Sequence, residues 1–284
     1  MVLRAKNGSI LLTLDDHILD DSYKAVAHNH HSLELSCVVD GSGSYRINDK
    51  NYDLKAGDII ILNSTEPHVI SIEEGSFLHH IVIHFDPSFI WNSLSNDLDY
   101  NFLLVFFERG PKFSNRLDRD NPATARIFSL MLEIKEELSS RKLCYELIVK
   151  NKLQTIFTEI IRNYDYIDHD KVVKPLSGSE IGYLNAVIGY INSNLDKELR
   201  LTELAEMVHV SPTYFSTMFK RFNGVSPVEY IVHKRVQRAI EMIRTTSLNL
   251  TEIAMACGFN NGTNFYKAFR KVTGRTPASY RRNK

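Results

Sequence analysis

Long apolar segments are missing from this 284-residue chain. Its longest uninterrupted apolar run, residues 102–107, is far shorter than the roughly 18 residues that a membrane-spanning helix needs. The first residues also lack the basic segment and apolar core of a secretory leader. The sequence therefore predicts a cytoplasmic protein with no membrane partner.

Cysteine is scarce, and neither charge is in excess. Cys37, Cys144 and Cys257 are odd in number and widely spaced, which argues against both a disulfide framework and a structural zinc site. We therefore expect three small buried residues. The 34 Lys and Arg residues balance 34 Asp and Glu, and 43% of the residues are apolar, as in ordinary globular proteins. The length is sufficient for two domains.

The charge is nevertheless unevenly distributed along the chain. Residues 180–284 hold 15 Lys and Arg against 8 Asp and Glu, a net charge of +7, whereas residues 1–179 carry a net charge of −7. Only the C-terminal part therefore has the electrostatics of a protein that binds a polyanion.

A duplicated segment occupies this basic part. Residues 201–230 read LTELAEMVHVSPTYFSTMFKRFNGVSPVEY, and residues 250–280 repeat the pattern, with one inserted residue, as LTEIAMACGFNNGTNFYKAFRKVTGRTPASY. The matching positions are those that build a helix-turn-helix. The repeat therefore predicts two copies of one small helical module.

Local signals place the helices of these modules. In the first copy Thr202 is expected to cap one helix, and Ser211 followed by Pro212 to begin the next, which ends at Gly224. Because the phenylalanines of this second helix form its buried stripe, other side chains face outward, where they would meet the major groove if the helix docks on DNA. In the first copy these are Thr213, Ser216, Thr217 and Lys220, with Arg221 beside them. In the second copy they are Gly262, Thr263, Asn264 and Lys267, with Arg270 and Lys271 nearer the phosphates.

A capping box, Ser226-Pro227-Val228-Glu229, begins the connection between the copies. The helix predicted from Pro227 to about Arg244 would hold the two recognition helices in successive major grooves, about 34 Å apart. Its basic side chains are either further phosphate contacts or a solvated charged face; they are Lys234, Arg235, Arg238 and Arg244.

The last 105 residues or so resemble the AraC/XylS transcription regulators. The resemblance is carried by Ile253-Ala254, by Gly258-Phe259, and by NFYKAFRKVTGRTPASYR from Asn264 to Arg281. It implies double-stranded promoter DNA as a partner, contact with RNA polymerase, and activation as the sign of regulation. It also implies that the base-reading positions are Thr213, Ser216 and Thr217 in the first copy and Gly262, Thr263, Asn264 and Lys267 in the second. The short hydroxyl side chains of the first copy predict a weaker base readout there.

The alternative for the C-terminal part is a helical protein-interaction domain. That interpretation accounts for the phenylalanines as core residues. It does not account for the repeated basic pairs, Lys220-Arg221 and Arg270-Lys271, or for the uneven charge.

The N-terminal half has the pattern of a strand-rich domain. Short alternating runs such as LELSCVV and DIIILN occur between about Ser22 and Phe85. Turn signals at Gly41-Ser42-Gly43, Asn48-Asp49 and Gly57-Asp58 separate them. Closely spaced strands of this kind predict a small barrel or jelly roll.

Histidines within this region resemble the cupin motif. His28-Asn29-His30, Glu34 and Gly41 match its first block, and Gly57 and His68 its second, although Asn63 and Thr65 replace the usual Pro and Gly. Cupins bind a metal with such side chains, here His28, His30, Glu34 and His68. The preferred interpretation is a ligand pocket without metal or other cofactor, lined by His28, His30, Glu34, Tyr45 and His68, and suited to a sugar. His79, His80 and His84 either extend this pocket or form a solvent-facing row.

Apolar residues recur at helical spacing from Asn121 to Tyr164. One apolar stripe contains Ile127 and Ile134, and another runs from Leu147 to Ile161, so two helices joined near Arg141 are predicted. This hairpin either forms a homodimer contact, as the family resemblance favours, or packs only on its own barrel. Residues 165–179 lack periodicity and read as a linker.

Together these signals predict an α+β protein: a cupin-like barrel with a helical hairpin, then an all-α domain with two helix-turn-helix motifs. The predicted divisions are 1–120 for the sensor barrel, 121–164 for the hairpin, 165–179 for the linker and 180–284 for the DNA-binding domain. We expect a small-molecule-responsive, sequence-specific transcription regulator that is not an enzyme. The alternatives are a metal-binding cupin enzyme or metal sensor fused to a DNA-binding domain, and a constitutive regulator whose barrel only folds and dimerises.

Overall fold

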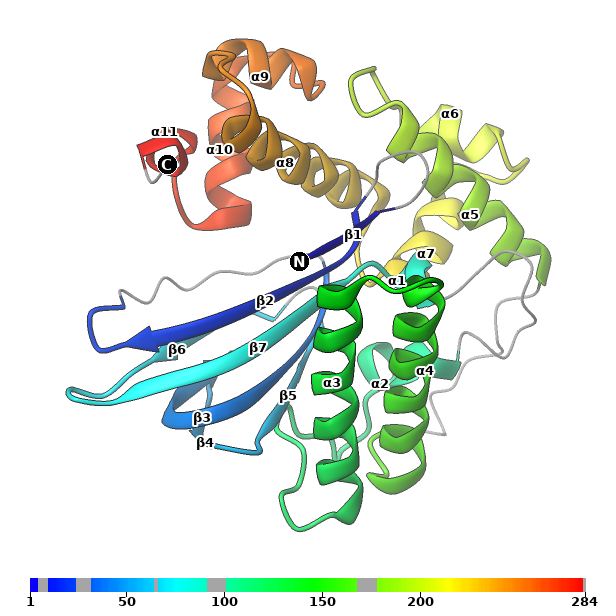
Figure 1. The fold of residues 1–284 in the computed structure, drawn as a ribbon. Helices are drawn as coiled ribbons and strands as arrows, with labels where there is room; N and C mark the ends of the chain where they lie inside the picture. The colour runs from blue at the N-terminus through cyan, green and yellow to red at the C-terminus, as the bar shows by residue number, and fades with distance from the viewer. Residues whose placement is uncertain (5–9, 24–31, 64–65, 91–100, 168–177, 283–284) are drawn as a thin grey trace. The chain divides into compact units, whose positions relative to one another are not determined.

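A computed structural model describes residues 1–4, 10–23, 32–63, 66–90, 101–167 and 178–282. They form two compact units with the boundary between Ile181 and Gly182. The N-terminal unit combines a sheet with a helical hairpin, and the C-terminal unit is built from helices (Figure 1). The predicted α+β class is therefore confirmed, while most of the predicted linker lies outside the described residues. No helix in the described ranges is long and apolar enough to cross a lipid bilayer.

The strands of the N-terminal unit pair antiparallel, and a long central strand joins two layers. They are β1 (Val2–Arg4), β2 (Ile10–Asp20), β3 (Leu33–Ile47), β4 (Lys50–Lys55), β5 (Ile59–Leu62), β6 (His68–Ser71) and β7 (Phe77–Phe85). The first part of β3 lies between β7 and β5, and its last part lies between β4 and β6. The order β1-β2-β7-β3-β4 is open at both ends, so pairing among the described strands does not close a barrel.

A bulge in β3 replaces the turn that the sequence predicted at Gly41-Ser42-Gly43. Gly41 has a φ of +82°, and a side chain there would lie 2.1 Å from the carbonyl oxygen of Phe77. The register between β3 and β7 shifts just before this glycine. Glycine is needed because the backbone is left-handed and closely packed, and the resulting bend lets one strand serve both layers.

A helical hairpin packs on this sheet, as Figure 1 shows for α3 (Pro122–Ser140) and α4 (Tyr145–Asn163). The ring of Phe157 in α4 lies 5.5 Å from Phe85 in β7 and 5.5 Å from Phe106. Phe106 belongs to one of two short helices, α1 (Pro87–Ile90) and α2 (Leu104–Phe107). The predicted pair of helices is confirmed, and an aromatic cluster joins it to the strands.

Two residues at the tip of the hairpin differ from expectation. Cys144 was expected to be buried, but it is exposed at the connection between α3 and α4, where its φ is +65°. Leu147, expected in the apolar stripe, is 61% exposed in the first turn of α4. Both predictions are wrong because neither the scattered spacing of the cysteines nor the helical spacing of apolar residues indicates where the packed surface ends.

The C-terminal unit contains α5 (Gly178–Ser193), α6 (Leu201–Glu206), α7 (Pro212–Asn223), α8 (Pro227–Thr245), α9 (Leu250–Ala256), α10 (Gly262–Thr273) and α11 (Pro277–Arg282). The predicted caps of α7 are confirmed: Ser211 accepts a hydrogen bond from the Tyr214 amide, and Gly224 has a φ of +74°. The capping box that begins α8 is also present. The predicted Thr202 cap is wrong, because α6 begins at Leu201 and the cap position is occupied by Arg200, two residues earlier.

The two helix-turn-helix motifs have equivalent aromatic cores. In the first, Phe219 lies edge-on to Tyr230 at 5.4 Å. In the second, Phe269 lies edge-on to Tyr280 at 5.3 Å. The duplicated sequence therefore produces a duplicated packing arrangement, with α6–α7 and α9–α10 as the two motifs and α8 as their connector.

Candidate functional site

The predicted recognition helix of the first motif, α7, presents a polar surface. Thr213, Thr217 and Lys220 are exposed, while Ser216 and Arg221 are half-buried. The Thr217 hydroxyl donates a hydrogen bond to the carbonyl oxygen of Thr213 at 3.0 Å. This bond occupies the hydroxyl's only hydrogen, so donation to a base edge would require it to break.

The corresponding surface of α10 offers longer side chains. The predicted contact residues on it are all exposed: Gly262, Thr263, Asn264, Lys267, Arg270 and Lys271. Phe265 and Phe269 occupy the opposite, buried side. The Asn261 side chain accepts a hydrogen bond from the Asn264 amide at 2.8 Å and so fixes the start of α10. The helix therefore presents one amide, one ammonium and two further basic side chains on its solvent side.

Sequence reasoning missed two aromatic residues on these helices. Tyr214 is 48% exposed on α7, and Tyr266 is 42% exposed on α10. The ring of Tyr266 lies edge-on to buried Phe265 at 5.7 Å, which supports it at the surface. A residue-by-residue comparison of the repeats aligns Tyr266 with Ser216. This replacement of a hydroxyl by an aromatic ring at a predicted contact position could have identified Tyr266 from the sequence.

The basic residues of the connector α8 have different surroundings. Arg238 and Arg244 are exposed. Lys234 lies over the ring of Tyr230 at 5.3 Å. Arg235 instead donates hydrogen bonds to backbone carbonyl oxygens of Leu195 and Lys197, so its guanidinium is bound within the protein.

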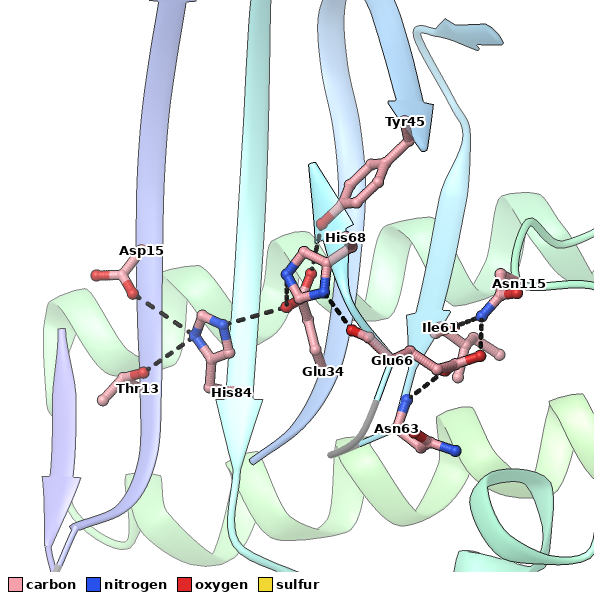
Figure 2. A network of polar contacts seen from close by, with 10 residues as sticks. All are labelled: Thr13, Asp15, Glu34, Tyr45, Ile61, Asn63, Glu66, His68, His84 and Asn115. Carbon is pink, nitrogen blue, oxygen red and sulfur yellow. Dashed lines mark hydrogen bonds and ion pairs between the residues drawn. The ribbon is translucent and has the colours of Figure 1, made fainter. Parts of the chain in front are cut away.

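A buried polar cluster lies in the N-terminal unit and contains three of the predicted pocket residues (Figure 2). Glu34 is only 1% exposed. Its carboxylate accepts a hydrogen bond from the Tyr45 hydroxyl at 3.1 Å and lies 3.8 Å from Nε2 of His68. The other two predicted pocket residues, His28 and His30, lie outside the described residues. The structure therefore brings together Glu34 and Tyr45 from β3 and His68 from β6.

His84 completes this cluster and carries a positive charge. Thr13, His84 and Glu34 are neighbours in one row across β2, β7 and β3. Nε2 of His84 lies 3.2 Å from the Glu34 carboxylate, and its Nδ1 lies 3.7 Å from Asp15. Burial alone would lower the pKa of His84, but the hydrogen bonds and negative charges of Asp15 and Glu34 outweigh it and raise the pKa to about 9. The buried Glu34 is thus neutralised by an imidazolium.

The other two histidines of β7 have separate roles. His80 is buried, and burial together with the charge of His17 lowers its pKa to about 4, so it is neutral at physiological pH. His79 lies 2.8 Å from the carboxylate of Asp16. Of the three, only His84 contacts the Glu34 cluster through a described contact.

A second polar group adjoins the cluster through His68. The Nδ1 atom of His68 lies 2.9 Å from the carbonyl oxygen of Glu66. The Glu66 carboxylate pairs with Arg109 at 2.7 Å. It also accepts a hydrogen bond from Asn115 at 3.1 Å (Figure 2). Hydrogen bonds and ion pairs together therefore extend from β2 across β7, β3 and β6 to the segment that follows α2. Within the described ranges, no three His, Cys, Asp or Glu side chains are arranged to hold a metal ion.

Comparison with known proteins gives the family. A domain family described as the AraC-like ligand binding domain matches residues 6–148, which is half of the chain. A second family, described as a helix-turn-helix domain, matches residues 204–283. The chain belongs to the AraC family. As an AraC-family member it is a ligand-responsive, DNA-binding transcriptional regulator, and the predicted function is confirmed at that level.

Relatives of this AraC-family protein match along most of its length. The HTH-type transcriptional regulator YfiF of Bacillus subtilis is 24% identical over 264 residues, covering 93% of this chain and 81% of the relative. The melibiose operon regulatory protein of Escherichia coli is 23% identical over 260 residues, covering 90% and 83%. The structure of ToxT from Vibrio cholerae has a TM-score of 0.62 at 14% identity, covering 95% of this chain and 97% of ToxT, and therefore shares its fold.

Proposed function

We propose that this regulator reads a bipartite promoter site with α7 and α10, each placed in a major groove. The observation that carries the proposal is that two equivalent helices bury their phenylalanines and expose polar and basic side chains on the opposite side. A helix of this size fits the major groove, where amide and ammonium groups read base edges. The net charge of +7 on residues 180–284 adds attraction to the phosphates.

Base reading and phosphate binding are assigned to different positions of α10. We propose that Lys267, in the middle of its exposed side, contacts bases, and that Lys271, one turn later, contacts phosphate. Lys267→Ala should then weaken binding to the preferred site more than binding to random DNA, because random DNA offers few correct base contacts. Lys271→Ala should weaken both comparably and lower the salt slope by about 1.

Fluorescence anisotropy titrations at several salt concentrations measure both effects. The preferred site is first obtained by selection from a random DNA library with the full chain. Each lysine variant serves as the control for the other, because both remove one positive charge from an exposed position of the same helix. Equal losses on preferred and random DNA for the two variants would contradict the division of roles.

The Glu34 cluster is proposed as the recognition site for a small-molecule effector, with sugars as the favoured class. Its carboxylate and imidazoles offer acceptors and donors for hydroxyl groups, and Tyr45 adds an aromatic ring. The weakest internal contact is the 3.8 Å separation of His68 from Glu34, so an effector hydroxyl would replace it at least cost. Similarity to a melibiose operon regulatory protein supports a sugar.

A thermal-shift screen of the full chain against sugars, with and without a metal chelator, tests the effector class. A ligand at about a hundred times its Kd should stabilise the folded protein by about 2.7 kcal/mol. We propose that the effector is bound and released unchanged, without an enzymatic step. Loss of stability on adding chelator, with no response to any sugar, would instead favour the metal-binding alternative with His28, His30, Glu34 and His68.

We further propose that the protein activates transcription as a homodimer through the α3–α4 hairpin and contacts RNA polymerase. The exposed apolar side chains at the hairpin tip support a protein contact there: Leu143 is 95% exposed and Leu147 is 61% exposed. Sedimentation equilibrium of the full chain and of Leu147→Glu tests the dimer. A wild-type chain that remains monomeric at micromolar concentrations would contradict it.

A further inference from the structure

Three segments of the C-terminal unit meet beside the middle of α8. The Arg235 guanidinium, on α8, donates from Nε to the carbonyl oxygen of Leu195 at 2.9 Å and from Nη2 to that of Lys197 at 2.6 Å. Both carbonyls belong to the connection between α5 and α6, which precedes the first motif. The same guanidinium lies 6.0 Å from the ring centre of Phe259, in the turn between α9 and α10.

The turn of the second motif approaches this connection very closely. Gly258 has a φ of +81°, and a side chain at this position would lie 2.1 Å from the carbonyl oxygen of Leu195. It would also lie 2.9 Å from Nε and from Nη2 of Arg235. The backbone before the first motif therefore lies against the turn of the second, with Arg235 beside both.

A guanidinium is well suited to hold such a junction. Its planar donors have a fixed geometry. Hydrogen bonds to the carbonyl oxygens of Leu195 and Lys197 therefore constrain both the position and the orientation of the connection between α5 and α6. Hydrogen bonds from a charged donor are roughly twice as strong as neutral ones. These donors are directed at backbone oxygens. Among the contacts of the described residues, the exposed Arg238 on the same helix has no such bond to another segment.

We propose that Arg235 is a positioning residue that fixes the distance and rotation between α7 and α10, and thereby sets the spacing of the two half-sites on DNA. The inference rests on the proposed reading of DNA by these two helices. The 19 residues of α8 span about 28 Å, and each motif is joined to an end of this rod. The Arg235 junction adds a lateral contact halfway along it, which opposes rotation of the motifs about their attachment points.

The helical repeat of DNA determines how accurately the two motifs must be spaced. One helical turn of about 34 Å contains about 10 base pairs, so one inserted base pair moves a half-site by about 3.4 Å and rotates it by about a tenth of a turn. A rigid pair of motifs loses the contacts of one recognition helix on such a site. A pair that can rotate recovers them, and therefore tolerates more than one spacing.

Selection from a random DNA library with the full chain tests the proposal. The wild-type protein should select two sequence blocks at one spacing, and Arg235→Gln should select the same blocks at several spacings. In direct titrations, inserting one base pair should weaken wild-type binding about tenfold or more, since base contacts of one helix are lost, and Arg235→Gln binding by less than about threefold. Arg238→Gln is the matched control, because it removes the same charge from an exposed position of α8, and it should keep the wild-type spacing.

Spacing preference separates positioning from a general loss of stability or charge, which would weaken all sites in parallel. Arg235→Lys keeps the charge but has a single donor group, and it replaces the Gln variant in the test if that variant fails to fold. It too should select half-sites at a wider range of spacings. A folded Arg235 variant that retains the wild-type spacing overturns the inference, as does equal broadening by Arg238→Gln. If the wild-type chain selects only one block, the proposed two-helix reading is itself wrong, an outcome distinct from either of these.

Discussion

Replacing Gly258 by alanine is the sharpest steric test of the C-terminal unit. The added methyl group would lie 2.1 Å from the carbonyl oxygen of Leu195, whereas ordinary contacts begin near 3.4 Å. The connection between α5 and α6 would have to move by roughly 1 Å or more. That movement would break the hydrogen bond from Arg235 to Leu195.

Two terms give the expected loss of stability. A left-handed backbone costs a residue with a side chain about 1–2 kcal/mol relative to glycine. Loss of a hydrogen bond from a charged donor costs about 1.5–3 kcal/mol. The sum is about 2.5–5 kcal/mol, a large part of the 5–15 kcal/mol typical of a folded domain. Because 1 kcal/mol shifts the Tm of a unit of about 100 residues by about 4–8 °C, we expect a decrease of about 10 °C or more.

Differential scanning calorimetry of the full chain measures this decrease. The transition of the C-terminal unit is identified as the one that added DNA moves to higher temperature. Gly189→Ala is the control, because Gly189 lies within α5 and a methyl group there meets nothing within 4 Å. It should raise stability by up to about 1 kcal/mol. A Gly258→Ala protein that melts within about 4 °C of the wild type would refute the close approach of Leu195.

Two further predictions concern the Glu34 cluster. Because the pKa of His84 is raised from 6.5 to about 9, its charge contributes stability that is fully present below pH 6.5 and is lost as the pH rises through about 9. The change should be on the order of 3 kcal/mol in urea unfolding, and a His84→Gln protein that shows the same pH dependence would contradict the assignment. Glu34→Gln should abolish the thermal shift produced by the effector, whereas Ser226→Ala, in the C-terminal unit, should retain it; an undiminished shift in Glu34→Gln would place the effector elsewhere.

The helical part of the fold was accessible from sequence because its signals are local. Each helix-capping signal lies within four residues of the helix end that it caps. The signals are Ser211, Gly224 and the Ser226–Glu229 capping box. Apolar periodicity likewise reports one helix at a time. The positions of α7, α8 and α10 could therefore be predicted closely, while Cys144 and Leu147, whose exposure depends on distant packing, could not.

The sheet and its cluster depended on relationships that no local pattern contains. The Gly41 segment reads as a turn, yet its left-handed φ produces a bulge because Phe77 of β7 lies against it. His84 meets Glu34 only because β7 and β3 pair in one register, and a shift of one residue would turn Ile83 or Phe85 toward the carboxylate instead. Sequence reasoning placed Glu34 and His68 in one pocket through the cupin resemblance and added Tyr45 as an aromatic ring lining it. The imidazole that lies 3.2 Å from the Glu34 carboxylate, His84, comes from a strand some 50 residues later.

The two motifs share a core but differ in what they offer to DNA. On α7 the predicted base-reading groups are hydroxyls, and that of Thr217 is already bonded to its own helix. On α10 the predicted base-reading groups include Asn264 and Lys267, which extend further and present several donors. Bidentate or charged contacts discriminate between bases more strongly than single hydroxyls do. The half-site read by α10 should therefore be more sharply defined than the half-site read by α7. Correct spacing between the motifs is then needed for α7 to reach its own, less sharply defined half-site.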